Sequence, residues 1–249
     1  MNNSLNLPDR SRKPRIDGIT SLHDISLTTK ELRYILEDYH EFIDFAKFGV
    51  GTAYIAPNLK RKIEIYKEFN IEVYFGGTLF EKFYSQGKLK EYRKFLDENL
   101  INTIEISCGT IDIDLEKRVK LVEDLKSHYM VLAEVGGKDS EMIMAPSIWI
   151  NEIESLLNAG SSYVITEGRD SGTAGIFRAD GEIRSGLLDD ISRFIDCKKI
   201  IFEAPNTLSQ MKFINKFGSN VNLANISPYD VLILEAQRQG LRSETFLLK

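Results

Sequence analysis

The stretch YVITEGRDSGTAGIF, from Tyr163 to Phe177, contains the pattern on which the fold prediction rests. It begins with four residues that are apolar or favour β-strands, and continues with Glu167, Arg169 and Asp170 before a flexible Ser-Gly stretch. In α/β enzymes, the loops that follow the carboxyl ends of strands carry the chemistry. We therefore interpret this stretch as a strand that ends at a functional loop.

Short β-rich runs of this kind recur at intervals of roughly 30 residues, and each is followed by a longer segment with helical spacing. The eight predicted strands are Arg15–Thr20, Phe42–Gly49, Glu72–Gly77, Thr103–Ser107, Met130–Gly136, Tyr163–Gly168, Ile200–Pro205 and Val221–Ile226. Alternating strands and helices indicate a parallel sheet, and eight such units close a barrel. The sequence therefore predicts an α/β fold, a (β/α)8 TIM barrel.

Start and stop signals support the helices between these strands. Thr29, Pro146 and Ser227 stand where helices are expected to begin, and Gly160 and Gly240 stand where two of them end.

The length and composition favour a single domain. The chain has 249 residues, of which 43% are hydrophobic and 28% are charged, and this is ordinary for a globular protein with a sizeable core. No Pro/Gly/Ser-rich or low-complexity stretch divides it. We predict a flexible N-terminal segment over residues 1–12 and a barrel domain over residues 13–249.

Several classes of partner are disfavoured. A net charge of −5 argues against a nucleic-acid partner, because phosphate neutralisation requires concentrated Lys and Arg. Cys108 and Cys197 form no framework of spaced pairs, which favours a reducing compartment. The first residues contain no signal-peptide core, and no apolar run approaches the ~18 residues needed to span a bilayer. We expect a cytoplasmic protein without a membrane partner. The net charge still permits a small anionic substrate, because a local pocket can oppose the global sign.

Acidic residues lie within or at the ends of five predicted strands, each flanked by apolar residues. They are Asp44, Glu105, Glu134, Glu167 and Glu203. A carboxylate in such surroundings loses several kcal/mol of hydration unless a cation compensates it. Because the strand ends of a barrel converge on one face, these carboxylates can share a hard cation such as Mg²⁺. The alternative is that each glutamate pairs with a Lys or Arg in a structural network.

Basic and small residues accompany these acids. Lys47, Lys138 and Arg169 are expected to handle an anionic substrate. Glu134, Gly136 and Lys138 alternate along the chain, so that Lys138 can lean over the barrel mouth and work as an acid or base, although a solvated loop lysine is the alternative.

Further candidates come from loops. Gly76 and Gly77 follow a strand and suit either close backbone approach to an oxyanion or a tight turn. Asn225 lies where the last strand leads to a helix N-terminus that could hold a phosphate. The histidines show no metal-ligand spacing, and we interpret them as surface or core residues. They are His23, His40 and His128.

From about Lys13 to Phe246, the chain resembles the phosphosulfolactate synthase family. The resemblance is carried by ordered segments: IDFAKFGVGT, VYFGGTLFE, EISCGT, EVGGK, VITEGRDSG, IFEAP, KFGSNVNLANI and GLRSETF. It implies a (β/α)8 barrel that uses Mg²⁺ to add sulfite to C3 of phosphoenolpyruvate, giving 2-phospho-3-sulfolactate. Barrel enzymes commonly associate, so we also expect a homo-oligomer.

The resemblance also implies roles for individual residues. Lys138 matches the lysine that the family uses as the proton donor to C2, Lys47 is a second cation and catalytic candidate, and Arg169 is the candidate for binding phosphate or sulfite. The residues at the matching acidic positions, implied to hold the metal, are Glu105, Glu134, Glu167 and Glu203.

The chain departs from the family's pattern at three places. Ile25 stands where a Lys is usual, Phe75 where a Pro is usual and Cys108 where an Asp is usual. Two alternatives therefore stay open: a paralogous barrel lyase that adds a different nucleophile to an enol phosphate, and a stress-related family member without turnover. We interpret Cys108 as a small buried hydrophobe rather than a reactive thiol.

Overall fold

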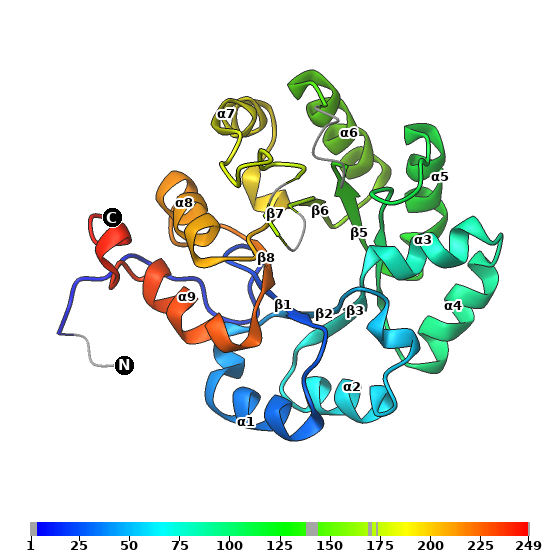
Figure 1. The fold of residues 1–249 in the computed structure, drawn as a ribbon, viewed down its shortest axis with the longest axis horizontal. Helices are drawn as coiled ribbons and strands as arrows, with labels where there is room; N and C mark the ends of the chain where they lie inside the picture. The colour runs from blue at the N-terminus through cyan, green and yellow to red at the C-terminus, as the bar shows by residue number, and fades with distance from the viewer. Residues whose placement is uncertain (1–3, 138–143, 169–170, 173, 249) are drawn as a thin grey trace.

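The protein folds as a (β/α)8 barrel, as predicted. The computed structural model describes residues 4–137, 144–168, 171–172 and 174–248. Within these residues, parallel strands β1 to β8 form a closed barrel in chain order, and the helices lie around it (Figure 1).

The strands are β1 (Thr20–Asp24), β2 (Phe45–Phe48), β3 (Glu72–Phe75), β4 (Thr103–Ile106), β5 (Met130–Val135), β6 (Tyr163–Thr166), β7 (Ile200–Glu203) and β8 (Leu223–Ile226). The α-helices are α1 (Thr29–Tyr39), α2 (Leu59–Glu68), α3 (Gly77–Ser85), α4 (Leu89–Glu98), α5 (Leu115–Leu125), α6 (Pro146–Ala159), α7 (Ser185–Phe194), α8 (Thr207–Phe217) and α9 (Val231–Arg238). Short 3₁₀ helices are η1 (His40–Phe42), η2 (Thr52–Tyr54), η3 (Cys197–Lys199), η4 (Pro228–Asp230) and η5 (Ser243–Thr245).

The alternation of side chains along each strand sorts residues between two cores. One face of each strand packs against the helices in a large apolar cluster, and the other fills the barrel interior. Leu132 and Ile201 belong to the interior cluster. Glu134 and Glu203 follow them by two residues and therefore lie on the same side of the sheet, one step nearer the carboxyl ends of the strands.

Local sequence explains where the predicted helices begin and end. The side chain of Thr28 caps α1 in a capping box with Glu31. Helix α6 has Pro146 at its first position and ends at Gly160, which is left-handed with φ of 118°. These boundaries agree with the predicted signals to within one residue.

The prediction for the first strand is wrong in position. The sequence pattern placed it at Arg15–Thr20, whereas β1 spans Thr20–Asp24. Gly18 adopts a left-handed φ of 72°, and Arg10 donates a hydrogen bond to its carbonyl oxygen at 2.8 Å. A left-handed residue is not extended, so the strand begins after Gly18, where Thr20 pairs with β8, and therefore later than the apolar pattern indicates.

Asp44 does not belong with the other acidic strand residues. It immediately precedes β2, at the amino end of the strand, where its Oδ2 lies 3.4 Å from Arg15 and accepts a hydrogen bond from the backbone N–H of Thr20 at 2.9 Å. The carboxyl end of the barrel is the opposite end, so the grouping of Asp44 with the glutamates is corrected: its carboxylate stabilises the base of the barrel.

The predicted boundary between residues 12 and 13 stays a prediction. Within the N-terminal segment, Arg10 forms an ion pair with Glu235 at 3.1 Å, and Ser219 donates a hydrogen bond to the carbonyl oxygen of Asp9 at 3.1 Å.

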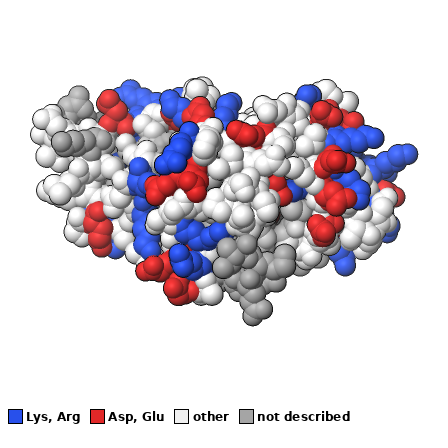
Figure 2. All heavy atoms as spheres, turned by 90° about the horizontal axis from the view of Figure 1, so that it is seen from above, with Lys and Arg blue, Asp and Glu red and all other residues white. Residues whose placement is uncertain are grey.

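Charges of both signs are mixed on the surface. Seen from above, the described Lys and Arg side chains are interspersed with Asp and Glu side chains (Figure 2). Among the residues that the structure describes, none of the helices has the length and apolar character required to cross a bilayer.

Arg238 joins the segments that meet where β1 and β8 close the barrel. It is fully buried in α9 and donates hydrogen bonds to the carbonyl oxygens of Ser219, Val221 and Ile19, next to the irregular pairing of β1 with β8.

We expect Arg238→Met to lower the free energy of unfolding by about 3 kcal/mol, because three buried acceptors lose their donor. Urea denaturation measures this, with exposed Arg193→Met as the control; equal stability of the two variants would contradict the role of Arg238.

Candidate active site

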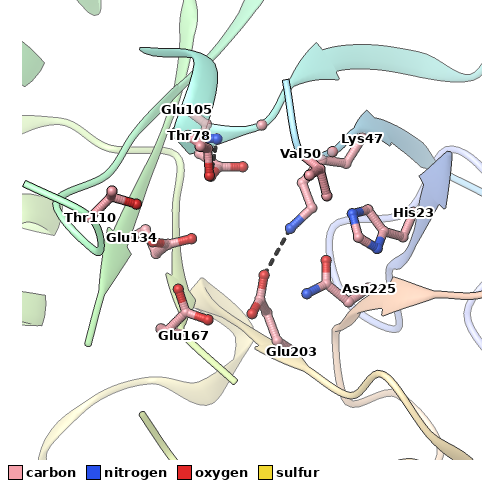
Figure 3. Close-up of a pocket in the computed structure, with 13 residues that line it drawn as sticks. His23, Lys47, Val50, Thr78, Glu105, Thr110, Glu134, Glu167, Glu203 and Asn225 are labelled. Atoms are coloured by element: carbon pink, nitrogen blue, oxygen red, sulfur yellow. Dashed lines mark hydrogen bonds and ion pairs between the residues drawn. The ribbon is translucent and has the colours of Figure 1, made fainter. Parts of the chain in front are cut away.

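A cavity of about 190 Å³ opens at the carboxyl ends of the strands, where barrel enzymes place their active sites (Figure 3). Its lining residues come from strands and loops all around the barrel. They are His23, Lys47, Gly49, Val50, Gly76, Gly77, Thr78, Glu105, Thr110, Glu134, Glu167, Glu203 and Asn225.

The four predicted glutamates lie together at this cavity. Glu105, Glu134 and Glu203 belong to β4, β5 and β7, and Glu167 directly follows β6. Each is between 1% and 4% exposed, and their carboxylates extend into the same space (Figure 3). Convergence of the strand ends therefore unites residues that are up to a hundred positions apart in the chain.

Lys47 and Glu203 form a buried ion pair across the cavity, with Nζ 2.8 Å from Oε1. Burial by itself lowers the pKa of Lys47, but the charges of Glu203, Glu105, Tyr74 and Glu134 outweigh it, and the pKa is raised well above the ordinary value. Burial favours the neutral form of Glu203, yet Lys47 and a backbone N–H hold the pKa of Glu203 below its usual range. Both groups are therefore charged at neutral pH.

Gly77 brings the backbone into contact with Glu105. Its N–H donates to Glu105 Oε1 at 2.6 Å, and a Cβ at this position would lie 2.1 Å from Ser107 Oγ. Gly76 also lines the cavity, and its N–H donates to the carbonyl oxygen of Phe48. The absence of side chains thus permits close packing against Glu105 and Phe48, and both N–H groups donate within the protein. The predicted approach of this backbone to an oxyanion stays a prediction.

Glu81 anchors the loop after β4. Its carboxylate accepts a hydrogen bond from Ser107 Oγ at 2.6 Å and from the backbone N–H groups of Thr110 and Ile111 at 2.7 Å each. The contact holds Thr110 at the cavity wall. In the same loop, burial raises the pKa of Cys108 to about 11, so its sulfur is a thiol at neutral pH and packs against the apolar core.

Asn225 combines two unfavourable features. It is a non-glycine residue with a left-handed φ of 58°, and its Oδ1 is buried without a hydrogen-bond partner in a side chain that is 4% exposed. Strained backbone and unsatisfied polar atoms concentrate at ligand-binding positions, where the ligand supplies the missing contact. The structure therefore places this predicted binding residue at the cavity with an unused polar atom.

The interpretation of His23 as a surface or core residue is corrected, because its side chain lines the cavity. It lies in β1, opposite Lys47 in the parallel register, and it lines the cavity. Because the first strand was predicted too early, His23 fell outside it. The alternation Ile19, Ser21, His23 would have identified it once the strand was placed correctly.

Two predicted site residues lie outside the described residues. They are Lys138 and Arg169. Their roles stay predictions from the sequence.

The donor set fits a hard cation. Four buried glutamates line the cavity, and carboxylates in such surroundings require cations or hydrogen-bond donors as partners. Within the described ranges, no group of three or more His, Cys, Asp or Glu side chains is placed to hold a metal by itself. Mg²⁺ commonly binds through one or two carboxylates together with water and substrate oxygens, so the glutamates suit this mode.

A closed (β/α)8 barrel with a charged cavity at the carboxyl ends of its strands defines a barrel enzyme. The sequence model of the (2R)-phospho-3-sulfolactate synthase (ComA) family matches residues 8–244. The chain therefore belongs to the phosphosulfolactate synthase family, whose members are lyase-type enzymes.

Individual relatives agree with this assignment. The chain is 42% identical to phosphosulfolactate synthase of Bacillus subtilis over 248 residues, which cover 98% of both chains. It is 42% identical to phosphosulfolactate synthase of Methanocaldococcus jannaschii over 235 residues, covering 92% of this chain and 94% of the relative. A solved 3-hexulose-6-phosphate synthase shares the fold, with a TM-score of 0.56 and 12% identity over 88% of this chain and 98% of that chain.

Loss of the Lys47–Glu203 ion pair should lower the stability of the protein by an amount that depends on pH. We expect Lys47→Met to lower the free energy of unfolding by about 3 kcal/mol at neutral pH, because Glu203 is left as an uncompensated buried charge. The lowered pKa of Glu203 in the parent means that the pair stabilises the fold above the ordinary carboxyl pKa of about 4.3, and that this contribution is lost as the pH falls through the folded-state value.

In the variant, burial without Lys47 raises the pKa of Glu203, so the carboxylate takes up a proton in mild acid. The stability deficit should therefore be larger near pH 7.5 than near pH 5, as measured by urea denaturation with exposed Lys60→Met as the control. A deficit independent of pH would show that Glu203 is not the group responsible.

Proposed function

We propose that this enzyme catalyses the Mg²⁺-dependent addition of sulfite to phosphoenolpyruvate, giving 2-phospho-3-sulfolactate. The observation that carries the proposal is the convergence of Glu105, Glu134, Glu167 and Glu203 with Lys47 on one cavity, in a member of the phosphosulfolactate synthase family. Membership supports the reaction, and the cavity supplies the charges that this reaction needs.

The bond changes define what the cavity must do. The sulfur of sulfite forms a bond to C3, the electrons of the C2–C3 double bond move toward C2 and the substrate carboxylate, and a proton is then added at C2. Negative charge develops on the carboxylate during the attack. When bound, Mg²⁺ would supply positive charge to the carboxylate oxygens at this point.

Different residues of the chain bind the cation, supply a fixed positive charge and donate the proton. Glutamates from β4 to β7 supply oxygen donors for the cation, and their burial keeps the field strong. The ammonium of Lys47 is a fixed positive charge, because its raised pKa makes it a weak proton donor. Delivery of the proton to C2 is therefore assigned to Lys138, as the family resemblance implies.

The reaction itself is tested by incubation of the purified protein with phosphoenolpyruvate, sulfite and Mg²⁺, followed by mass spectrometry of the products. We expect a product heavier than phosphoenolpyruvate by one added sulfite, and loss of its formation when the metal is chelated with EDTA and restored by Mg²⁺. If sulfite gives no product but phosphoenolpyruvate still raises the melting temperature, a different nucleophile replaces sulfite. If neither effect occurs, the enzyme does not use this substrate.

The assignment of Lys138 as the proton donor leads to a second prediction, for the activity of a variant without this lysine. Lys138→Ala should lower kcat by at least about 100-fold, the range of a lost general acid, with an unchanged circular dichroism spectrum and melting temperature. Lys82→Ala, in α3, is the matched control and should retain parental activity. Turnover of Lys138→Ala at the parental rate would exclude Lys138 as the donor.

A further inference from the structure

The cavity has two chemically different sides. Glu105, Glu134 and Glu167 line the side formed by β4 to β6, whereas His23, Lys47 and Asn225 come from β1, β2 and β8 and line the side across from them (Figure 3). The first side provides acceptor oxygens for a cation. The second provides nitrogen groups that can donate hydrogen bonds, together with the ammonium of Lys47.

Packing holds the ring of His23 at this wall. In the parallel register His23 lies beside Lys47, and a Cβ added to Gly49 would lie 1.8 Å from His23 Nε2. The imidazole therefore occupies the space that a side chain at position 49 would fill. Such close packing orients a ring, which lowers the entropy cost of binding a ligand.

A second cavity adjoins the first at this wall. It has a volume of about 290 Å³, and its lining includes Ser26, Ser227 and Tyr229. His23 and Asn225 line both cavities, so these two side chains form the shared wall. A ligand group at the wall can therefore contact both residues while the rest of the ligand extends toward the glutamates.

Asn225 gives independent evidence of a ligand at this wall. Its Oδ1 is buried without a partner, and its backbone is held in a left-handed conformation. Rotation of the amide about its last torsion exchanges the acceptor for the Nδ2 donor without moving the backbone. The side chain can therefore present N–H groups to an anion.

We propose that His23 is a substrate-contacting residue which, together with Asn225, binds the phosphoryl group of the substrate at the β1–β8 edge of the cavity. This proposal rests on the proposed function for the identity of the substrate. The carboxylate that gains charge belongs near the cation on the glutamate side, which leaves the phosphoryl group for the donor side. A phosphate between the loops after the last strands is also a recurrent arrangement in barrel enzymes.

Steady-state kinetics separate the phosphoryl group from sulfite. We expect His23→Leu to raise KM for phosphoenolpyruvate at least about 10-fold, the loss of roughly one hydrogen bond to a charged group, while kcat and KM for sulfite change less than about 3-fold. His23→Gln keeps an N–H donor and should recover most of the affinity. The matched control is His128→Leu, because His128 is exposed and precedes β5 at the other end of the barrel.

Two results would overturn the proposal. One is an unchanged KM for phosphoenolpyruvate in His23→Leu; the other is a rise in KM for sulfite alone, which would place the nucleophile at this wall. A His23→Gln variant that folds like the parent but binds as weakly as His23→Leu would also exclude hydrogen-bond donation by the ring. Circular dichroism and melting temperature establish folding for each variant.

Calorimetry with inorganic phosphate makes the test independent of turnover. We expect the parent and His128→Leu to bind phosphate equally and His23→Leu to bind it at least about 10-fold more weakly. If the parent forms no sulfonated product but phosphate binding still depends on His23, the proposed function fails and the anion site stands. If product forms while phosphate binding is the same in parent and His23→Leu, the anion site fails and the proposed function stands.

Discussion

The buried ion pair between Lys47 and Glu203 is the interaction on which the cavity depends. Four carboxylates within a few per cent of full burial would repel one another and lose their hydration without partners, and the ammonium of Lys47 supplies one such partner, to Glu203. Burial of the apolar side chains inside the barrel and beneath the helices supplies the free energy that offsets this cost. A cation bound among these carboxylates would lower their mutual repulsion, which would link the stability of the site to its proposed chemistry.

One geometric rule connects this charged cavity to the core below it. Residues two apart on a strand face the same side, so Leu132 leads to Glu134 and Ile201 leads to Glu203 along the barrel interior. The apolar layer closes the base and excludes water, and the next layer presents charges to the cavity. A shift of one residue in either strand would turn the carboxylate toward the helices instead. The strand register that places apolar side chains in the core therefore also directs these carboxylates into the cavity.

The two sides of the cavity carry different chemical groups, so a bound ligand has a preferred orientation. Glutamates gather on the β4–β6 side, while nitrogen-bearing side chains from β1, β2 and β8 stand across from them (Figure 3). A small dianion with a carboxylate at one end and a phosphoryl group at the other matches such polarity, because each end meets a different kind of partner. The strained Asn225 lies on the donor side, where rotation of its amide would direct the N–H groups of Nδ2 to such a ligand.

The sequence by itself determined the barrel, most strand positions and the glutamates that share the cavity, because alternation and strand-end placement are local patterns that every βα unit repeats. Only the tertiary structure decided which residues oppose one another. The backbone is left-handed at Gly18, so β1 begins after it, and pairing with β2 places His23 beside Lys47. Likewise, Asp44 has apolar flanking residues like those of the strand glutamates, but its carboxylate pairs with Arg15 at the opposite end of the barrel. Such pairings depend on contacts between distant segments, which no local spacing encodes.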